Sequence, residues 1–199
     1  MPSSRRPSQP LVLASTSRYR RELLERLRIP FEAAAPQFDE APLASETPSA
    51  TAERLAAGKA RSLAARFPDA LIIGSDQVAS CDGARLDKPG DHATAVRQLR
   101  FQSGKAAQFD TAVALLDASS GKLESRVVGC RVVFRKLSDE LIERYLRKEQ
   151  PYDCAGSAKA EGLGIALIEK IETDDPTSLI GLPLIALTAM LARAGLPVL

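Results

Sequence analysis

The segment LVLASTSRYR, residues 11–20, is the most informative part of the sequence for the fold class, because a short apolar run leads directly into a helix start. Leu11–Ala14 predict a short buried strand, and Ser17 is a favourable N-cap for the helix that follows. A helix N-terminus carries unpaired backbone N–H groups and partial positive charge, so it attracts anions. The hydroxyls of Ser15, Thr16 and Ser17, followed by several arginines, therefore predict a phosphate-binding corner.

Strand-like and helix-like segments continue to alternate along the chain, which predicts the α/β class. We expect helices at 17–28, 48–67, 91–101, 138–148 and 177–194, and strands at 11–14, 71–78, 107–117, 123–134 and 165–171. A Ser-Ser-Gly turn between the third and fourth of these strands indicates a β-hairpin. Neither a repeat nor a low-complexity linker divides the chain, so we expect a flexible tail over 1–10 and a single domain over 11–199.

The composition is that of an ordinary globular protein, with 45% hydrophobic and 26% charged residues. A net charge of +2 and only 5% aromatic residues argue against a dedicated nucleic-acid partner. The longest stretch of low polarity, residues 179–192, contains glycine and proline and is too short to span a bilayer, so we expect no membrane partner. The three cysteines are widely spaced and form no metal-binding pattern. We therefore expect a soluble cytoplasmic protein with reduced cysteines.

Two basic side chains lie on the apolar faces of their predicted helices. Arg20 precedes a pair of leucines by three and four residues, and Lys59 lies four residues from a leucine on either side. Buried charges are costly unless they are paired, so both cations need anionic partners. The alternative is that their aliphatic stems lie at the edge of the core while the charged ends reach solvent. Together with the hydroxyl corner, the two cations favour a shared anion-binding cleft.

The strand expected at 71–78 contains a polar interruption, formed by Ser75, Asp76 and Gln77. Strand alternation places Ser75 and Gln77 on one face and Asp76 on the other. Ligands of open α/β sheets gather at the carboxyl ends of strands, where we expect these side chains to lie. The alternative is a strand that simply ends in a polar turn, but the apolar pattern resumes directly afterwards.

Three further features are less specific. Glu40 is a candidate ligand of a divalent metal, although an exposed loop carboxylate is the commoner role of such a residue. The glycine-rich stretch 156–164 permits close approach of the backbone to a ligand, but it matches neither a Walker A motif nor a dinucleotide fingerprint. We interpret His92, the single histidine, as a surface residue, so a Ser-His-Asp triad is not expected.

Seven segments, in order along the chain, resemble the Maf family of nucleoside triphosphate pyrophosphatases. They are ASTSRYRRELL (14–24), Asp39-Glu40, the helix with Lys59, IIGSDQV (72–78), Asp87-Lys88-Pro89, CAGSAKAEGLG (154–164) and GLPLIAL (181–187). The resemblance covers nearly the whole chain from residue 11. It implies a fold like that of the Maf proteins and inosine triphosphatases, which is an elongated, two-lobed mixed sheet with flanking helices and a central cleft. It also implies a homodimer that hydrolyses a nucleotide to its monophosphate and pyrophosphate.

The resemblance further implies roles for individual residues. Asp76 is expected as the general base, and the residues expected around the triphosphate are Arg20, Lys59, Lys88, Ser15, Thr16 and Ser17. Hydrolysis between the α- and β-phosphates needs an activated water and usually Mg²⁺ or Mn²⁺, which Asp76 and Glu40 would hold. Both roles of Asp76, base and metal ligand, remain open at this point.

Three positions, Tyr19, Gln77 and Glu161, resemble the subgroup of the family that acts on 7-methyl-GTP. Methylation at N7 makes the guanine ring cationic, so an aromatic face and a carboxylate both attract it. That subgroup often has tryptophan in place of Tyr19 and proline in place of Arg18. The smaller ring of tyrosine predicts that this chain selects 7-methyl-GTP less strongly or accepts other nucleotides as well. The alternative for Tyr19 is a first-turn residue that covers Leu23.

We therefore expect hydrolysis of 7-methyl-GTP to 7-methyl-GMP and pyrophosphate, which removes modified nucleotides from the pool. One alternative is a dTTP/UTP-type or broad-specificity pyrophosphatase of the same family. The other is a nucleotide-binding regulator of septum formation that binds without turnover. Relative rates on different nucleotides distinguish the first alternative from a 7-methyl-GTP pyrophosphatase. Release of pyrophosphate distinguishes an enzyme from the regulator of the second alternative.

Overall fold

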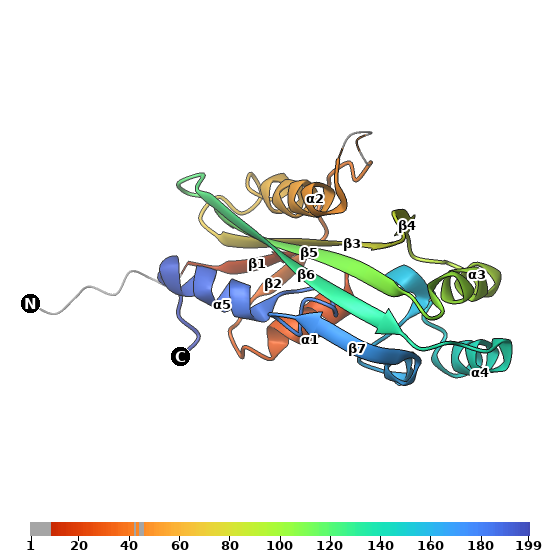
Figure 1. Ribbon diagram of the computed structural model, residues 1–199. Coiled ribbons are helices and arrows are strands. Elements are labelled where there is room, and N and C mark those ends of the chain that lie inside the picture. The colour runs from red at the N-terminus through yellow and green to blue at the C-terminus, as the bar shows by residue number, and fades with distance from the viewer. Residues whose placement is uncertain (1–8, 42, 44–45) are drawn as a thin grey trace, which may run out of the picture.

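A seven-stranded mixed sheet runs along the computed structural model, which describes residues 9–41, 43 and 46–199 (Figure 1). The strands are β1 (Leu11–Ala14), β2 (Glu32–Ala34), β3 (Leu71–Cys81), β4 (Ala84–Leu86), β5 (Ala106–Asp117), β6 (Leu123–Phe134) and β7 (Ile168–Thr173). Their order is β2-β1-β3-β5-β6-β7, with β4 paired to β3. β1 is parallel to β2 and β3, and the remaining pairs are antiparallel. The α/β class and the expected hairpin, β5–β6, are confirmed.

The described residues form five α-helices around this sheet. They are α1 (Arg18–Glu25), α2 (Pro48–Ser62), α3 (His92–Gln102), α4 (Asp139–Glu149) and α5 (Leu184–Arg193). In Figure 1, α2 covers one face of the sheet, α1 and α5 lie on the other side, and α3 and α4 lie together at one end. Short 3₁₀ turns at Ala155–Ser157 and Leu163–Leu167 precede β7.

Two large hydrophobic clusters give the molecule its two lobes. In the first, Leu23 and Leu24 of α1 pack with Leu187 of α5 against β1 and β3. In the second, Leu99 of α3 and Leu146 of α4 pack against β5 and β6. All five leucines are fully buried, and each contributes roughly 2 kcal/mol relative to an exposed position. Each lobe therefore has a core of its own.

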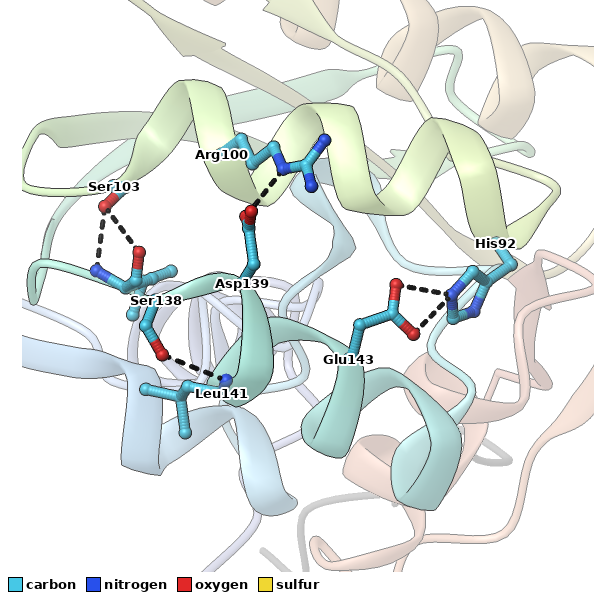
Figure 2. Close-up of polar contacts among 8 residues, drawn as sticks. His92, Arg100, Ser103, Ser138, Asp139, Leu141 and Glu143 are labelled. Atoms are coloured by element: carbon cyan, nitrogen blue, oxygen red, sulfur yellow. Dashed lines mark hydrogen bonds and ion pairs between the residues drawn. The ribbon is translucent and has the colours of Figure 1, made fainter.

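Polar contacts join α3 to α4 at the end of the second lobe (Figure 2). Arg100 Nε donates to Asp139 Oδ1 at 2.7 Å, and His92 Nε2 lies 3.1 Å from Glu143 Oε2. The other ring nitrogen of His92, Nδ1, lies 3.0 Å from the Tyr152 hydroxyl. His92 is partly exposed, as expected of a surface residue, but it also holds the loop that follows α4.

Side-chain caps confirm the expected starts of α2, α3 and α4. Thr47 accepts from Ala50 N, Asp91 from Thr94 N, and Ser138 from Leu141 N. The first two helices end earlier than expected, α1 at Glu25 rather than 28 and α2 at Ser62 rather than 67. A proline follows closely in each case, at 30 and at 68. Because the residue before proline disfavours the α conformation, the chain leaves the helix through tight turns.

The final helix begins at Leu184, so the expectation of a helix from 177 is wrong. Residues 177–181 form turns and 182–183 have no regular structure, since Pro183 lacks a backbone N–H and cannot continue a helix from the preceding residues. The buried Asp175 carboxylate accepts from the backbone N–H of Ile185 at 2.7 Å and caps the shortened helix. Carbonyls of the preceding turn can therefore accept hydrogen bonds from side chains, as Gly181 O does from Arg20 Nε.

Several strand boundaries also differ from the expectation. β7 spans 168–173 rather than 165–171, because the residues before it form a 3₁₀ turn. β3 continues to Cys81, since it stays paired with β5 beyond residue 78. The short strands β2 and β4 were not expected. Each has three residues, which is too few for periodicity to indicate a strand.

The expected N-terminal tail falls largely outside the described residues, which begin at residue 9. Gln9 Nε2 donates to Asp117 Oδ1 at 3.2 Å, and Leu71 N donates to Pro10 O at 2.8 Å. The three cysteines are free, as expected. Within the described ranges, none of the helices combines the length and apolarity needed to cross a bilayer.

Candidate active site

A cavity of about 710 Å³ is lined by elements of both lobes. The start of α1 and the 179–181 turn line it from the first lobe, and the loops at 85–88 and 153–161 line it from the second. The cavity brings together all the side chains expected at the site, which are Ser15, Thr16, Ser17, Tyr19, Arg20, Glu40, Lys59, Asp76, Gln77, Lys88 and Glu161. The sequence therefore identified one site, and the individual roles remain predictions.

The polar interruption lies inside β3, so its expected position at the carboxyl end of that strand is wrong. β3 keeps its antiparallel register with β5 throughout, and Asp76 lies opposite Ala112. It is β1 that ends here, since Ala14 pairs with Gly74. The three polar residues thus lie just beyond the carboxyl end of a parallel neighbour, where the sheet leaves space for a ligand.

The expected alternation within this segment is confirmed. Ser75 Oγ donates to Gly181 O at 2.9 Å, and Gln77 Nε2 donates to Ser178 O at 3.0 Å, so both side chains face the 178–181 turn. Asp76 lies on the opposite face, toward α2. The strand therefore directs Ser75 and Gln77 toward the 178–181 turn and Asp76 toward Lys59 of α2.

Lys59 and Asp76 form a buried ion pair, with 5% and 8% of their surfaces exposed. Lys59 Nζ donates to Asp76 Oδ1 at 2.6 Å and lies 3.0 Å from Glu40 Oε2. The ammonium thus has two anionic partners, and the alternative in which Lys59 reaches solvent is wrong. A buried charge of this kind is stable only while its partners remain.

Two glycines allow this arrangement by close contact. A Cβ atom at Gly74 would lie 2.0 Å from the carbonyl oxygen of Ala56, so only glycine lets α2 approach β3 here. A Cβ atom at Gly58 would lie 2.2 Å from Phe38 Cζ, so the ring of Phe38 rests on that glycine. The second contact holds the loop that carries Glu40 against α2, beside Lys59.

The hydroxyl corner is a helix cap as well as a part of the cavity. Ser15 is buried and its Oγ accepts from Ser17 N at 3.1 Å, while Ser17 Oγ accepts from Arg20 N at 3.4 Å. Thr16 is exposed at the cavity rim. Each hydroxyl keeps its O–H group as a donor, so the corner can still bind a phosphate oxygen.

Arg20 is held in place by the turn before α5. Its Nε donates to Gly181 O at 2.9 Å, and the same carbonyl accepts from Ser75. Burial lowers the pKa of Arg20, and the charges of Asp76 and Glu40 oppose that shift. A guanidinium remains protonated in proteins, so Arg20 brings a fixed positive charge to the cavity.

Lys88 lies exposed at the cavity rim, on the loop between β4 and α3. Gly90 N donates to Tyr152 O at 3.0 Å, which ties this loop to the one that follows α4. The residues that the structure describes place no carboxylate in ion-pair contact with Lys88. Its charge is therefore available to a ligand.

Gln77 and Tyr19 line a further part of the cavity, which we name the base end. The amide nitrogen of Gln77 lies 2.9–3.1 Å from three acceptors, Thr111 Oγ1, Ser178 O and Leu179 O, which occupy both of its N–H groups. With its nitrogen fully used, Gln77 keeps its carbonyl oxygen as an acceptor. Burial raises the pKa of the Tyr19 hydroxyl, which therefore stays protonated and donates to Asp153 Oδ1 at 3.2 Å.

Glu161 and Cys154 complete this end. Desolvation at the cavity wall raises the pKa of the Glu161 carboxyl, and Lys159 opposes that shift. Burial raises the pKa of the Cys154 thiol to about 11, so it is not a thiolate at neutral pH. Cys154 lines the cavity, with its Sγ 3.6 Å from the Tyr19 hydroxyl.

The sequence reasoning missed two contributors to the site. Asp153 lines the cavity and bonds Tyr19, but it precedes the glycine-rich block and carried no signal of its own. The Gly181 carbonyl orients both Arg20 and Ser75, although its segment was expected to be helical. Here a signal was present, because glycine followed shortly by proline marks a turn.

A divalent cation fits the carboxylates of Asp76 and Glu40. Asp76 Oδ1 and Glu40 Oε2 both lie within 3.0 Å of the Lys59 nitrogen, so the two carboxylates are neighbours around that ammonium. Residues 9–41, 43 and 46–199 place no group of three or more His, Cys, Asp or Glu side chains at a metal site. One or two carboxylates completed by phosphate oxygens is the usual way in which Mg²⁺ is bound. The pair therefore fits a cation that binds together with a phosphorylated substrate.

Comparison with known proteins gives a consistent result over nearly the whole chain. The sequence profile of the family described as "Maf-like protein" matches residues 10–194. A "7-methyl-GTP pyrophosphatase" of Polaromonas sp. is 59% identical over 188 residues, which are 94% of this chain and 86% of that protein. Proteins with the same name are 58% identical in Thiobacillus denitrificans (98% of this chain, 96% of that protein) and 56% identical in Cupriavidus pinatubonensis (96% of both).

Proposed function

The chain belongs to the Maf family, and from that premise we propose that it hydrolyses 7-methyl-GTP to 7-methyl-GMP and pyrophosphate. The observation that carries the chemistry is the buried Asp76–Lys59 pair in a cavity lined by further cations. The names of the relatives, at 56–59% identity, support the choice of nucleotide. The enzyme is a hydrolase that acts on an acid anhydride.

Asp76 is the general base in this reaction. Its Oδ1 is bound to Lys59, whereas Oδ2 has no hydrogen-bond partner among the described residues. Oδ2 can accept a proton from a water that attacks the α-phosphorus. Lys59 fixes the orientation of the carboxylate, because the pair is short and buried.

The cations at the other walls stabilise the leaving pyrophosphate. Cleavage between the α- and β-phosphates transfers negative charge to the leaving group, and fixed positive charges lower that barrier. Arg20 and Lys88 line the cavity from different lobes, so both can face one triphosphate. The hydroxyls of Ser15 and Ser17 add donors at the start of α1.

We propose Asp76 and Glu40 as the ligands of Mg²⁺ or Mn²⁺. When bound, such a cation would neutralise phosphate charge and orient the reacting group. Support comes from the convergence of both carboxylates on Lys59. The contact between Phe38 and Gly58 holds the loop that supplies Glu40.

The nucleotide base is recognised at the base end of the cavity. The Gln77 carbonyl and the Glu161 carboxylate can accept the N–H groups of guanine. The Tyr19 ring offers an aromatic face to a cationic purine. Together these groups favour 7-methylguanine over a pyrimidine, which has fewer donors and no positive charge.

Product analysis tests this function. Purified protein with 7-methyl-GTP and Mg²⁺ is expected to yield equal amounts of 7-methyl-GMP and pyrophosphate, separated by anion-exchange chromatography. Release of inorganic phosphate and 7-methyl-GDP would overturn the proposed position of cleavage. Nucleotide binding without any product would support a regulator in place of an enzyme.

Replacement of Glu40 by Gln is expected to raise the Mg²⁺ concentration for half-maximal rate by about tenfold. The variant keeps the size of the side chain but removes one of the two proposed ligand charges. The measurement is the rate as a function of free Mg²⁺ at saturating nucleotide. Asp39→Asn is the matched control, because Asp39 is the neighbouring carboxylate and does not line the cavity. Equal Mg²⁺ requirements in Glu40→Gln and wild type would remove Glu40 from the metal site.

We also propose a cytoplasmic homodimer, on the family resemblance alone. Light scattering of the purified protein is expected to give twice the chain mass of 21.3 kDa. A monomer mass over the working concentration range would contradict the dimer.

A further inference from the structure

The base end of the cavity already holds a planar cation, which the chain itself supplies. The guanidinium carbon of Arg18 lies 4.7 Å from the centroid of the Tyr19 ring. Arg18 Nη2 also donates to the Tyr19 hydroxyl at 2.6 Å and lies 3.7 Å from Asp153 Oδ2. An aromatic ring and a carboxylate thus hold a flat, delocalised positive charge at the cavity wall.

This arrangement matches the chemistry of the proposed substrate. A guanidinium stacks on aromatic rings because it is planar and weakly hydrated, and an N7-methylated guanine is likewise a planar cation. We propose that Tyr19 and Asp153 form a cation subsite for the base, in which Arg18 is an internal occupant that the substrate displaces. The inference rests on the proposed function and adds Asp153 and Arg18 to the residues that set specificity.

Arg18 can be displaced because its contacts are exposed. Its side chain is 64% exposed and that of Asp153 is 52% exposed. Exposed ion pairs contribute little free energy, since water and salt screen them. A substrate base enters as part of a molecule that is also held at its triphosphate, so it competes at high effective concentration.

Asp153 is the carboxylate that faces this subsite most directly. Lys159 Nζ also approaches the Tyr19 ring, at 5.7 Å from its centroid, but it is paired with Glu149 at 3.1 Å. Glu161 lies at the same end, and desolvation raises the pKa of its carboxyl. Among the described residues, Asp153 is the carboxylate that accepts a hydrogen bond from Tyr19, so its charge is fixed beside the ring.

The loop that carries Asp153 is held by its neighbour Tyr152. The Tyr152 hydroxyl lies 3.0 Å from His92 Nδ1, and the Tyr152 carbonyl accepts from Gly90 N at 3.0 Å. His92 is in turn held by Glu143, as Figure 2 shows. The carboxylate is therefore positioned from the second lobe, whereas Arg18 and Tyr19 come from α1.

The first test replaces Asp153 by Asn and compares two nucleotides that differ only at N7. The ratio of kcat/KM for 7-methyl-GTP to that for GTP is expected to fall by about tenfold, through KM for 7-methyl-GTP. The rate on GTP is expected to stay within about twofold of wild type, since a neutral ring gains little from the carboxylate. An unchanged ratio would overturn the subsite.

The second test removes the internal occupant. Arg18→Ala is expected to lower KM for 7-methyl-GTP several-fold, on the order of 2- to 5-fold, and to leave KM for GTP nearly unchanged. Arg21→Ala is the control, since Arg21 is an exposed arginine of the same helix that does not line the cavity. A higher KM for 7-methyl-GTP in Arg18→Ala would show that Arg18 assists the base, and would overturn its role as a competitor.

A binding measurement separates this inference from the proposed function. Calorimetry with the products 7-methyl-GMP and GMP is expected to show tighter binding of 7-methyl-GMP to wild type, with the difference reduced in Asp153→Asn. If wild type hydrolyses GTP faster than 7-methyl-GTP, the proposed function fails. If wild type prefers 7-methyl-GTP and Asp153→Asn keeps that preference, the subsite alone fails.

Discussion

Replacement of Asp76 by Asn is expected to lower kcat by about a thousandfold, because a general base contributes 10²- to 10⁴-fold to proton transfer. Asparagine has the same shape as aspartate. Its carbonyl oxygen can still accept a hydrogen bond from Lys59 Nζ, which lies 2.6 Å from Asp76 Oδ1 in the wild-type protein. The fold should therefore remain intact while the acceptor for the proton of the attacking water is lost. Steady-state release of pyrophosphate from 7-methyl-GTP measures the effect.

The control for Asp76→Asn is Asp110→Asn on β5. Asp110 is a half-buried carboxylate on the neighbouring strand, and it does not line the cavity. Its replacement should leave kcat near the wild-type value, and thermal unfolding should confirm that both variants are folded. Turnover by Asp76→Asn near the wild-type rate would contradict the assignment of Asp76 as both base and metal ligand.

Replacement of Lys59 by Met is expected to lower the free energy of unfolding by about 3 kcal/mol, the scale observed when one partner of a buried ion pair is removed. Methionine fills a similar volume but leaves the Asp76 carboxylate, only 8% exposed, without its cation. Glu40 also loses its partner, at a smaller cost because it is exposed. Turnover should fall as well, since the charge that orients the base is absent.

The double variant Lys59→Met/Asp76→Asn separates stability from catalysis. With no uncompensated buried charge left, it should recover most of the lost free energy of unfolding, because replacing both members of a buried pair is often close to neutral. It should remain inactive. Urea unfolding of the wild type, both single variants and the double variant gives the coupling energy. A Lys59→Met protein as stable as wild type would contradict the account of the pair.

Local patterns predicted the parts of the site that depend on neighbouring residues in the chain. The strand at 11–14 and the helix start at Ser17 were predicted from a short apolar run and a capping residue. The position of Asp76 and Gln77 on opposite faces of their strand was predicted from strand alternation. The inward position of Lys59 follows from helical spacing. Each of these inferences needed only a few consecutive residues, and the structure confirms them.

Packing between distant segments decided the parts that the sequence did not predict. Glu40 meets Lys59 because Phe38 rests on Gly58, a contact between a loop and a helix that leaves no periodic signal. The segment 177–183 has the apolar composition of a helix, yet its carbonyls are needed to hold Arg20. Asp153 reaches Tyr19 only because the two lobes meet at the cavity.

The most direct test is the specificity constant of the purified wild-type protein on 7-methyl-GTP, GTP, UTP, dTTP and CTP, at one pH and one Mg²⁺ concentration. The cavity is lined by an aromatic ring, a fixed acceptor, carboxylates and the buried Asp76–Lys59 pair, and it predicts the highest kcat/KM for 7-methyl-GTP. Faster turnover of UTP and dTTP than of 7-methyl-GTP would contradict it.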